Sequence, residues 1–281
     1  MSLSLRDECR IVLRPDCIAL AQVRREFTPR GVRRHVQAMQ VVPCDAPADE
    51  KQPWSGALKT LEAALPDSAG SKSYATVILS NHFMRYTLVP WSDDLNDETE
   101  EIAYAQHLFN GMYGSEAREW ELRISPGKTG MPQLASAVDA GLAGALREMF
   151  GRREIGLKSI QPHLMMACNA CHASLRGQSA WLALVEQGSL FLAWLQKGQW
   201  SWIRTMRIGS DWHDELPFLL SREELVANIE NSTNDVFLWA PDCKETPVIS
   251  GGRWQIRHMQ PARMPGADAA LDGRFAKYMS E

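Results

Sequence analysis

The sequence predicts an α/β protein with two lobes, because the order strand, strand, strand, helix, strand occurs twice along its 281 residues. The first copy of this unit begins at Arg10 and the second at Ser179. In both copies, short apolar segments are separated by turn residues, and a segment with helical spacing follows. We expect a first lobe over residues 1–176 with an α+β insertion at about 92–154, a second lobe over 177–260 and a tail over 261–281.

The first copy contains three expected strands, a helix and a central strand. The uninterrupted, β-branched segment Ala75–Leu79 is typical of a strand that is buried on both faces. One face of the expected helix carries apolar residues at spacings of four, three and four, and Pro66 follows it: Trp54, Leu58, Leu61 and Leu65. The three earlier strands are expected at Arg10–Leu13, Ile18–Val23 and Arg33–Val42, with a turn at Pro15-Asp16.

The insertion begins with the clearest helix of the chain. Asp97 and Glu100 have the spacing of a capping box, and Gly114 is placed to end the helix. The expected buried face consists of Ile102, Ala105, Phe109 and Met112. The following elements are expected at Trp120–Ile124, Gln133–Val138, Ala140–Phe150, Ile155–Ile160 and Pro162–Leu175, of which the third and fifth are helices.

The second copy has strands at Ala180–Val185, Leu190–Leu195 and Trp200–Arg207, with hairpin turns at Gly188-Ser189 and Lys197-Gly198. Asp211 is the expected cap of the next helix, whose apolar face consists of Leu216, Leu219, Leu220, Leu225 and Ile229. Strands at Asp235–Trp239 and Trp254–Met259 close the lobe. The tail carries an apolar stripe that we expect to dock on the protein's own core: Leu271, Phe275 and Tyr278 or Met279.

Charge and composition exclude several classes of protein. The net charge is −4, and the basic residues are dispersed except around Arg24-Arg25 and Arg30 to Arg34, which we interpret as a solvated strand edge. Because nucleic acid binding needs a basic stripe, we expect no nucleic acid partner. The most apolar segment, Ala180–Leu195, is too short and interrupted to span a bilayer, and the six cysteines form no dense framework. We expect a cytoplasmic protein, with any membrane association peripheral.

The segments VILSNHFMRYTLVPW (Val77–Trp91) and SAWLALVEQGSLFLAWLQKGQWSWIRTMRIG (Ser179–Gly209) resemble the actin-like assembly proteins of type IV pili, the PilM type. They also resemble the related cytoplasmic domain of the type II secretion L protein. The resemblance covers most of residues 10–260 as topology and strand texture rather than as a diagnostic motif. It implies an actin-like, ribonuclease-H-like fold and a role in a pilus or secretion assembly platform.

The resemblance also implies where a nucleotide would bind. Actin-like ATPases present Asp-x-Gly in the first hairpin, where the Asp orients a magnesium-bound water and the Gly admits phosphate to backbone N–H groups. The first hairpin here has Arg14-Pro15-Asp16-Cys17, without glycine, and proline has no N–H to offer. The second hairpin keeps one acid, Glu186, and one glycine, Gly188, and the expected adenosine turn is Ala240-Pro241-Asp242-Cys243. Asp16, Glu186 and Gly188 are therefore candidate residues of a degenerate ATP site.

Cys168-Asn169-Ala170-Cys171-His172 matches the attachment pattern of a c-type haem. The absence of an export signal and the position of the motif inside an expected helix disfavour that interpretation. A zinc site of Cys168, Cys171 and His172, with or without His163, lacks a second ligand pair, and a redox dithiol lacks its usual strand context. Small apolar fillers are the alternative role for these cysteines.

Ten tryptophans are a large number for this chain, and three of them fall on expected neighbouring strands. Trp200 and Trp202 are two residues apart on a strand, so we expect them to share a face, with Trp194 near one of them. Interfaces favour tryptophan, which makes Trp200 and Trp202 candidate partner-binding residues, although packing under a helix explains them as well.

The sequence therefore predicts a scaffold without catalytic activity, a pseudo-ATPase at the inner face of the inner membrane that binds an inner-membrane pilus or secretion assembly protein. It would associate with the membrane only through that partner. One alternative is an actin-like protein that binds or hydrolyses ATP at Asp16 and Glu186. The other alternative is a haem or metal protein that uses Cys168, Cys171 and His172.

Overall fold

The computed structural model describes residues 8–28, 31–47, 51–65, 74–95, 97–229, 232–243, 249 and 252–259. These residues form two compact units: one is drawn from Met1–Met84 and Val138–Ala170, the other from Arg85–Ala137 and Cys171–Gln260. The lobe boundaries expected from the sequence follow the duplicated order of strands and differ from the boundaries of these two units. They stay a prediction. The expected tail and its apolar stripe lie outside the described residues, as does Pro66.

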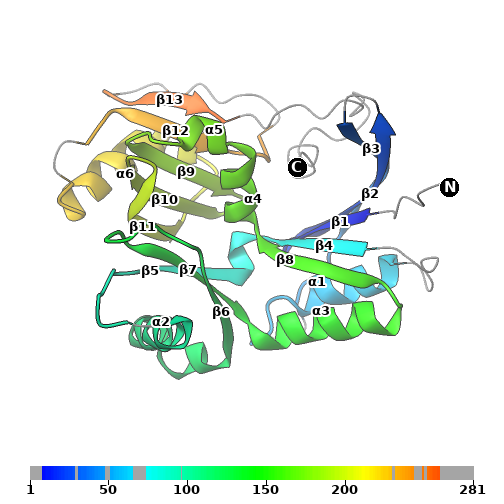
Figure 1. Cartoon of the computed structure of the whole chain (residues 1–281). Coiled ribbons are helices and arrows are strands. Elements are labelled where there is room, and N and C mark those ends of the chain that lie inside the picture. The colour runs from blue at the N-terminus through cyan, green and yellow to red at the C-terminus, as the bar shows by residue number, and fades with distance from the viewer. Residues whose placement is uncertain are drawn as a thin grey trace. The chain divides into compact units, whose positions relative to one another are not determined.

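The first unit is built on a five-stranded mixed sheet with the order β3-β2-β1-β4-β8 (Figure 1). Its two central strands, β1 and β4, pair in parallel and are buried along most of their length, as their continuous apolar segments predict. The strands run over Glu8–Leu13 (β1), Cys17–Thr28 (β2), Gly31–Pro43 (β3), Tyr74–Leu79 (β4) and Gly156–Pro162 (β8).

Two helices cover the first sheet side by side, α1 (Ser55–Ala64) and α3 (Ala140–Arg152) (Figure 1). Trp54, at the start of α1, packs against Gly141, where a Cβ atom would lie 3.3 Å from the indole ring. Asp139 caps α3 by accepting hydrogen bonds from the N–H groups of Gly141 and Leu142. The end of α3 is tied to α1 because the guanidinium of Arg153 donates to the carbonyl oxygen of Glu62 at 2.7 Å.

The helix expected over 162–175 is in fact two helices, so that prediction was wrong. The first, α4, covers His163–Ala170, and the second, α5, covers His172–Leu175. Cys171 separates them with φ −112° and ψ 15°, which is outside the helical region. The motif of two cysteines and a histidine therefore straddles a break between two helices.

The second unit repeats the same topology. Its five-stranded sheet has the order β11-β10-β9-β12-β13, in which two antiparallel hairpins are followed by two parallel neighbours, as in the first sheet (Figure 1). The strands run over Ala180–Glu186 (β9), Ser189–Gln196 (β10), Gln199–Arg207 (β11), Asp235–Trp239 (β12) and Gln255–His258 (β13). The duplicated order of strands that the sequence predicts is therefore present.

The helix α6 (Trp212–Val226) packs one face on the second sheet. Leu216, Leu219 and Leu220 are buried as expected, but Leu225 is 80% exposed because it lies two helical turns from Phe218, on the opposite face. Asp211 precedes the helix, yet its side chain makes no capping hydrogen bond and instead accepts one from the Ser210 hydroxyl. Leu225 is therefore not part of the buried face of α6, and Asp211 does not cap the helix with its side chain, contrary to both expectations.

A three-stranded sheet of order β5-β7-β6 and the helix α2 (Glu98–Tyr113) form the insertion. The carboxylate of Asp97 caps α2 by accepting a hydrogen bond from the Glu100 N–H at 2.9 Å, and Gly114 ends it with φ +74°, both as predicted. Ala105 and Phe109 are buried, whereas Met112 is 53% exposed, contrary to expectation. The strands run over Met84–Val89 (β5), Trp120–Ile124 (β6) and Gln133–Asp139 (β7).

The strand β5 was not predicted from the sequence. Only the single turn η1 (Asn81–Phe83) separates it from β4, and that turn contains neither glycine nor proline. Ser80 makes the turn possible, because its hydroxyl accepts a hydrogen bond from the N–H of His82 at 3.3 Å. Within the described ranges, no helix is long and apolar enough to cross a membrane.

Candidate functional site

The first hairpin, at the position of the expected phosphate turn, is closed by an ion pair. The guanidinium of Arg14 donates to the carboxylate of Asp16 through Nε at 3.0 Å to Oδ1 and through Nη2 at 3.4 Å to Oδ2. Arg14 is buried, whereas the side chain of Asp16 is 45% exposed. The carboxylate that would orient a magnesium-bound water is thus neutralised from within the protein.

Backbone groups of this hairpin also make hydrogen bonds within the protein. The N–H of Arg14 donates to the carbonyl oxygen of Cys17 at 3.1 Å, and the N–H of Cys44 donates to the carbonyl oxygen of Asp16 at 2.8 Å. Pro15 has no N–H. Burial, with the neighbouring carboxylate of Asp16 as the next cause, raises the pKa of the Cys17 thiol to about 12. The thiol of Cys17 therefore stays protonated at neutral pH.

The second hairpin places Glu186 and Gly188 at the turn between β9 and β10. Glu186 is buried at the end of β9, opposite Ser189 in the register. Gly188 has φ +74°, and a Cβ atom at this position would meet no heavy atom within 4 Å. The turn therefore requires this glycine for its backbone conformation rather than for a close contact.

The two candidate phosphate turns lie in different units, since Asp16 belongs to the first and Glu186 and Gly188 belong to the second. The third expected turn follows β12 and has no glycine: the N–H of Cys243 donates to the carbonyl oxygen of Ala240 at 3.3 Å, and Cys243 packs against the core of the second unit.

Trp200 and Trp202 do not share a face, so that prediction was wrong. Trp202 pairs with Trp194 and Trp200 pairs with Leu195, which makes Ser201 the extra residue of a β-bulge in β11. The bulge turns Trp202 toward Trp181, with ring centroids 5.7 Å apart, and Trp200 toward Phe191, at 6.3 Å. Both tryptophans are half-buried on the edge strand of the sheet. The expected proximity of Trp194 to one of them is confirmed.

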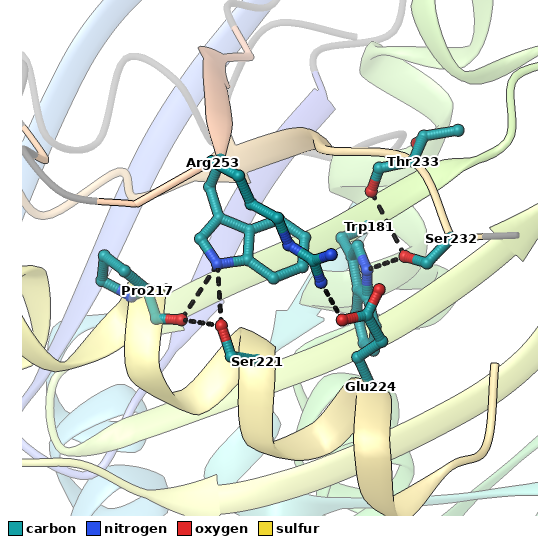
Figure 2. Close-up of polar contacts among 8 residues, drawn as sticks. Trp181, Pro217, Ser221, Glu224, Ser232, Thr233 and Arg253 are labelled. Carbon is teal, nitrogen blue, oxygen red and sulfur yellow. Dashed lines mark hydrogen bonds and ion pairs between the residues drawn. The ribbon is translucent and has the colours of Figure 1, made fainter. Parts of the chain in front are cut away.

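Trp181 is the centre of a tryptophan cluster between the second sheet and α6, which sequence reasoning missed. Its ring centroid lies 5.7 Å from Trp194 and 6.4 Å from Trp254. The indole N–H of Trp181 donates to the hydroxyl of Ser232 at 3.0 Å, as Figure 2 shows. The burial of Trp181 could have been predicted from its position in a continuous apolar strand.

The indole N–H of Trp254 holds α6 to the strand β13. It donates to the carbonyl oxygen of Pro217 at 3.0 Å and lies 3.2 Å from the hydroxyl of Ser221 (Figure 2). Arg253 bonds the carboxylate of Glu224 on the last turn of α6, and its guanidinium lies 4.6 Å from the centroid of the Trp254 ring. These contacts give the second unit a firmly packed helix.

The Cys168-Cys171-His172 motif is not assembled as a ligand set. Neither Cys168 nor Cys171 is in a disulfide; Cys171 is buried, while His172 is exposed. Burial raises the pKa of the Cys171 thiol to about 11. In the part of the chain that the structure describes, no three His, Cys, Asp or Glu side chains come together as a metal ion would need.

Comparison with known proteins identifies the fold. The chain matches the structure of a PilM–PilN type IV pilus biogenesis complex with a TM-score of 0.61 and 13% identity, over 96% of each chain. It matches the cytoplasmic domain of EpsL, an inner membrane component of the type II secretion system of Vibrio cholerae, with a TM-score of 0.56 and 12% identity, over 98% of this chain and 95% of that one.

A third match is a Bacteroides thetaiotaomicron protein with an actin-like ATPase fold and unknown function, with a TM-score of 0.55 and 11% identity over 83% of this chain and 81% of that one. No protein-family model matches the sequence, and no curated protein does either. The chain therefore has the actin-like ATPase fold predicted from its duplicated strands. It shares this fold over nearly its whole length with a chain of a type IV pilus biogenesis complex and with the cytoplasmic domain of a type II secretion component.

Proposed function

We propose that this protein is a scaffold without ATPase activity, which works in the cytoplasm by binding an inner-membrane partner of a pilus or secretion assembly platform. The observation that carries the absence of catalysis is the ion pair between Arg14 and Asp16. Magnesium would have to compete with a buried guanidinium for this carboxylate, and phosphate would find Pro15 where a backbone donor is needed.

The likeness to PilM and EpsL supports the scaffold role. Both matched chains are covered to 95% or more, so this protein has the whole of the shared architecture. One of them was solved in a complex with PilN, and the other is an inner membrane component. By analogy, we infer a partner that is anchored in the inner membrane and that reaches this protein with a cytoplasmic segment.

The edge strand β11 is the surface that we propose for this segment. It is nine residues long and forms one edge of the second sheet, where an extended peptide can add as a further strand. Trp200 and Trp202 are both half-buried on this strand, and they project from opposite faces of it. An added strand would thus contact one tryptophan on each face.

Two measurements test the proposal. Isothermal titration with Mg-ATP should give no binding heat, and the variant Asp16→Asn should behave identically; magnesium-dependent binding that Asp16→Asn or Glu186→Gln abolishes would favour the nucleotide-binding alternative.

Affinity capture from native cells should recover inner-membrane pilus or secretion proteins, and the Trp200→Ala variant should recover less of them. Capture that is equal for a folded Trp200→Ala variant would remove β11 as the binding edge.

A further inference from the structure

One face of the first sheet is buried along β1, β2 and β4. Alternate residues of a strand point to opposite faces, and the register places Arg10 of β1 beside Ala21 of β2 and Thr76 of β4. We call this side of the sheet the Arg10 face, and its members on these three strands are Glu8, Arg10, Val12, Ala19, Ala21, Val23, Thr76 and Ile78. None of these side chains belongs to a residue that is more than 6% exposed.

The helices α1 and α3 lie on the opposite face, to which Leu13 points. The carbonyl oxygen of Leu13 accepts a hydrogen bond from the N–H of Ser80, so this carbonyl is directed at β4. With that orientation, the connection from β3 through α1 to the parallel strand β4 is right-handed only if α1 lies on the Leu13 face. Cys44 continues the alternation of β3 on that face, and its thiol accordingly hydrogen-bonds with Thr60 of α1. Since α3 lies beside α1, it covers the Leu13 face as well.

The Arg10 face needs a cover of its own. The remaining α-helix among the described residues of the first unit, α4, has eight residues and packs mainly beside β4 and β8. Val23 on β2 is 1% exposed and Arg10 on β1 is 6% exposed. Side chains of this size on a bare sheet face would be in contact with water. A further segment of the chain is therefore required over β1 and β2.

The cover is one helix wide. On the neighbouring strand β3, Met39 lies opposite Ala21 and Val41 lies opposite Ala19, so both belong to the same face. Met39 is only half-buried, and Val41 is 38% exposed. The cover therefore spans β1 and β2 and ends before β3. Two strand spacings are about 10 Å, which is the width of one α-helix with its side chains.

The segment that follows β13 has the length and the pattern for this helix. Residues 260–281 are the only segment of more than eight residues outside the described part of the chain. Their apolar stripe has helical spacing and consists of Leu271, Phe275 and Tyr278 or Met279. From 271 to 279 a helix is about 12 Å long, and the strand from Glu8 to Val12 is about 13 Å long. A helix this short is marginal in water, so it needs an apolar surface to pack on.

Charge favours the same segment. Arg10 and Glu8 are both buried on the Arg10 face, with Nε of Arg10 3.4 Å from Oε1 of Glu8. On a helix, Asp272 lies beside the stripe, three residues before Phe275. A guanidinium has five N–H donors in a planar fork, so Arg10 can bond a carboxylate of this segment in addition to that of Glu8.

We propose that residues 268–281 form a helix that covers the Arg10 face, with Phe275 over Ala21 and Asp272 bonded to Arg10. The small side chains of Ala19 and Ala21 leave room for an aromatic ring between β1 and β3. The end of the chain then completes the first unit, although it follows the second unit in the sequence.

Labelling of the Glu8 carboxylate in the full chain, with a carbodiimide and glycine ethyl ester and with detection by mass spectrometry, tests the proposal. Glu8 should react slowly, and Phe275→Asp should raise its rate roughly tenfold or more, because a buried aspartate releases the cover. Ala270→Asp is the matched control: it adds the same charge off the stripe and should leave the rate unchanged. Alkylation of Cys9, which points to the Leu13 face, reports unfolding of the whole sheet and should stay slow in both variants.

A second measurement does not depend on a destabilising variant. Ala21→Cys combined with Phe275→Cys should form a disulfide under mild oxidation, because a ring packed on Ala21 brings the two positions within bonding range. Gln22→Cys combined with Phe275→Cys should not, since Gln22 points to the Leu13 face. Equal cross-linking of the two pairs overturns the proposal, as does a rate of Glu8 labelling that Phe275→Asp leaves unchanged. No partner protein takes part, so neither result depends on the proposed scaffold function.

Discussion

Trp200 and Trp202 point to opposite faces of their sheet although only Ser201 separates them. The bulge in β11 inserts Ser201 as an unpaired residue, so that Trp202 packs on Trp181 and Trp200 packs on Phe191. An unbulged strand would have put both indoles on one side. The consequence is that the edge strand is fixed to the core from both faces of the sheet.

Loss of the Trp202 ring should therefore destabilise the second unit. Trp202→Ala removes an indole from the tryptophan cluster around Trp181, and we expect the free energy of unfolding to fall by about 2–4 kcal/mol. Trp202→Phe keeps an aromatic ring there and should cost less than half as much. Urea denaturation followed by circular dichroism measures both; equal, small effects would show that the cluster contributes little.

The buried carboxylate of Glu223 should be the most sensitive charged group of α6. It accepts hydrogen bonds from Arg204 Nη1 at 2.7 Å and from Arg222 Nε at 2.8 Å, and it is fully buried. Glu223→Gln removes the charge that both cations face, so we expect a loss of about 2–4 kcal/mol in the free energy of unfolding.

Arg204→Gln is the matched variant for Glu223, because Arg222 still neutralises the carboxylate. Since Arg204 is half-exposed, we expect a loss of only about 1 kcal/mol. The two variants are compared by urea denaturation at pH 7. A larger loss for Arg204→Gln than for Glu223→Gln would contradict this account of the pair.

Two glycines of the second unit should respond in opposite directions to alanine. Gly198 has φ +74°, and a Cβ atom there would lie 2.7 Å from the backbone nitrogen of Gly177, so Gly198→Ala should cost about 1–3 kcal/mol or more. Gly111 lies inside α2 with no heavy atom within 4 Å of an added Cβ. Gly111→Ala should therefore stabilise by about 0.5–1 kcal/mol, as thermal denaturation can show.

The buried thiol of Cys171 predicts a loss of stability at high pH. Burial raises its pKa in the folded protein to about 11, whereas an unfolded thiol has a pKa of about 8.5. Below pH 8.5 both states keep the proton, and the full stability is present. Between about pH 9 and pH 11 only the unfolded state loses the proton, so unfolding becomes more favourable as the pH rises.

The measurement is the urea midpoint at pH 8 and at pH 10 for the natural chain and for Cys171→Ala. The decline should be smaller in the variant, because Cys9 and Cys17, whose thiols also have raised pKa values, remain in both proteins. Identical declines would mean that the Cys171 thiol is exposed to titration in the folded state. Slow alkylation of the Cys171 thiol in the folded protein at pH 8 would show independently that this thiol is buried.

Local sequence patterns were sufficient for the fold class and for most of the order of elements, but they missed β5 and the break between α4 and α5. Continuous apolar segments identified β4, β9 and β12, and the cap at Asp97 and the glycine at Gly114 bounded α2 to the residue. The same patterns showed that the first phosphate turn lacks glycine. These features depend only on neighbouring residues, because burial of a central strand and capping of a helix are encoded within a few positions.

What only the tertiary structure decided are the features that depend on contacts between distant segments. The faces of Trp200 and Trp202 follow from a bulge in the register with β10, and the Trp181 cluster follows from a sheet that brings Trp194, Trp202 and Trp254 around one indole. None of these has a local signature, since one inserted residue reverses every face beyond it. The sequence alone thus determined a duplicated actin-like fold, and packing determined which of its side chains are left to meet a partner.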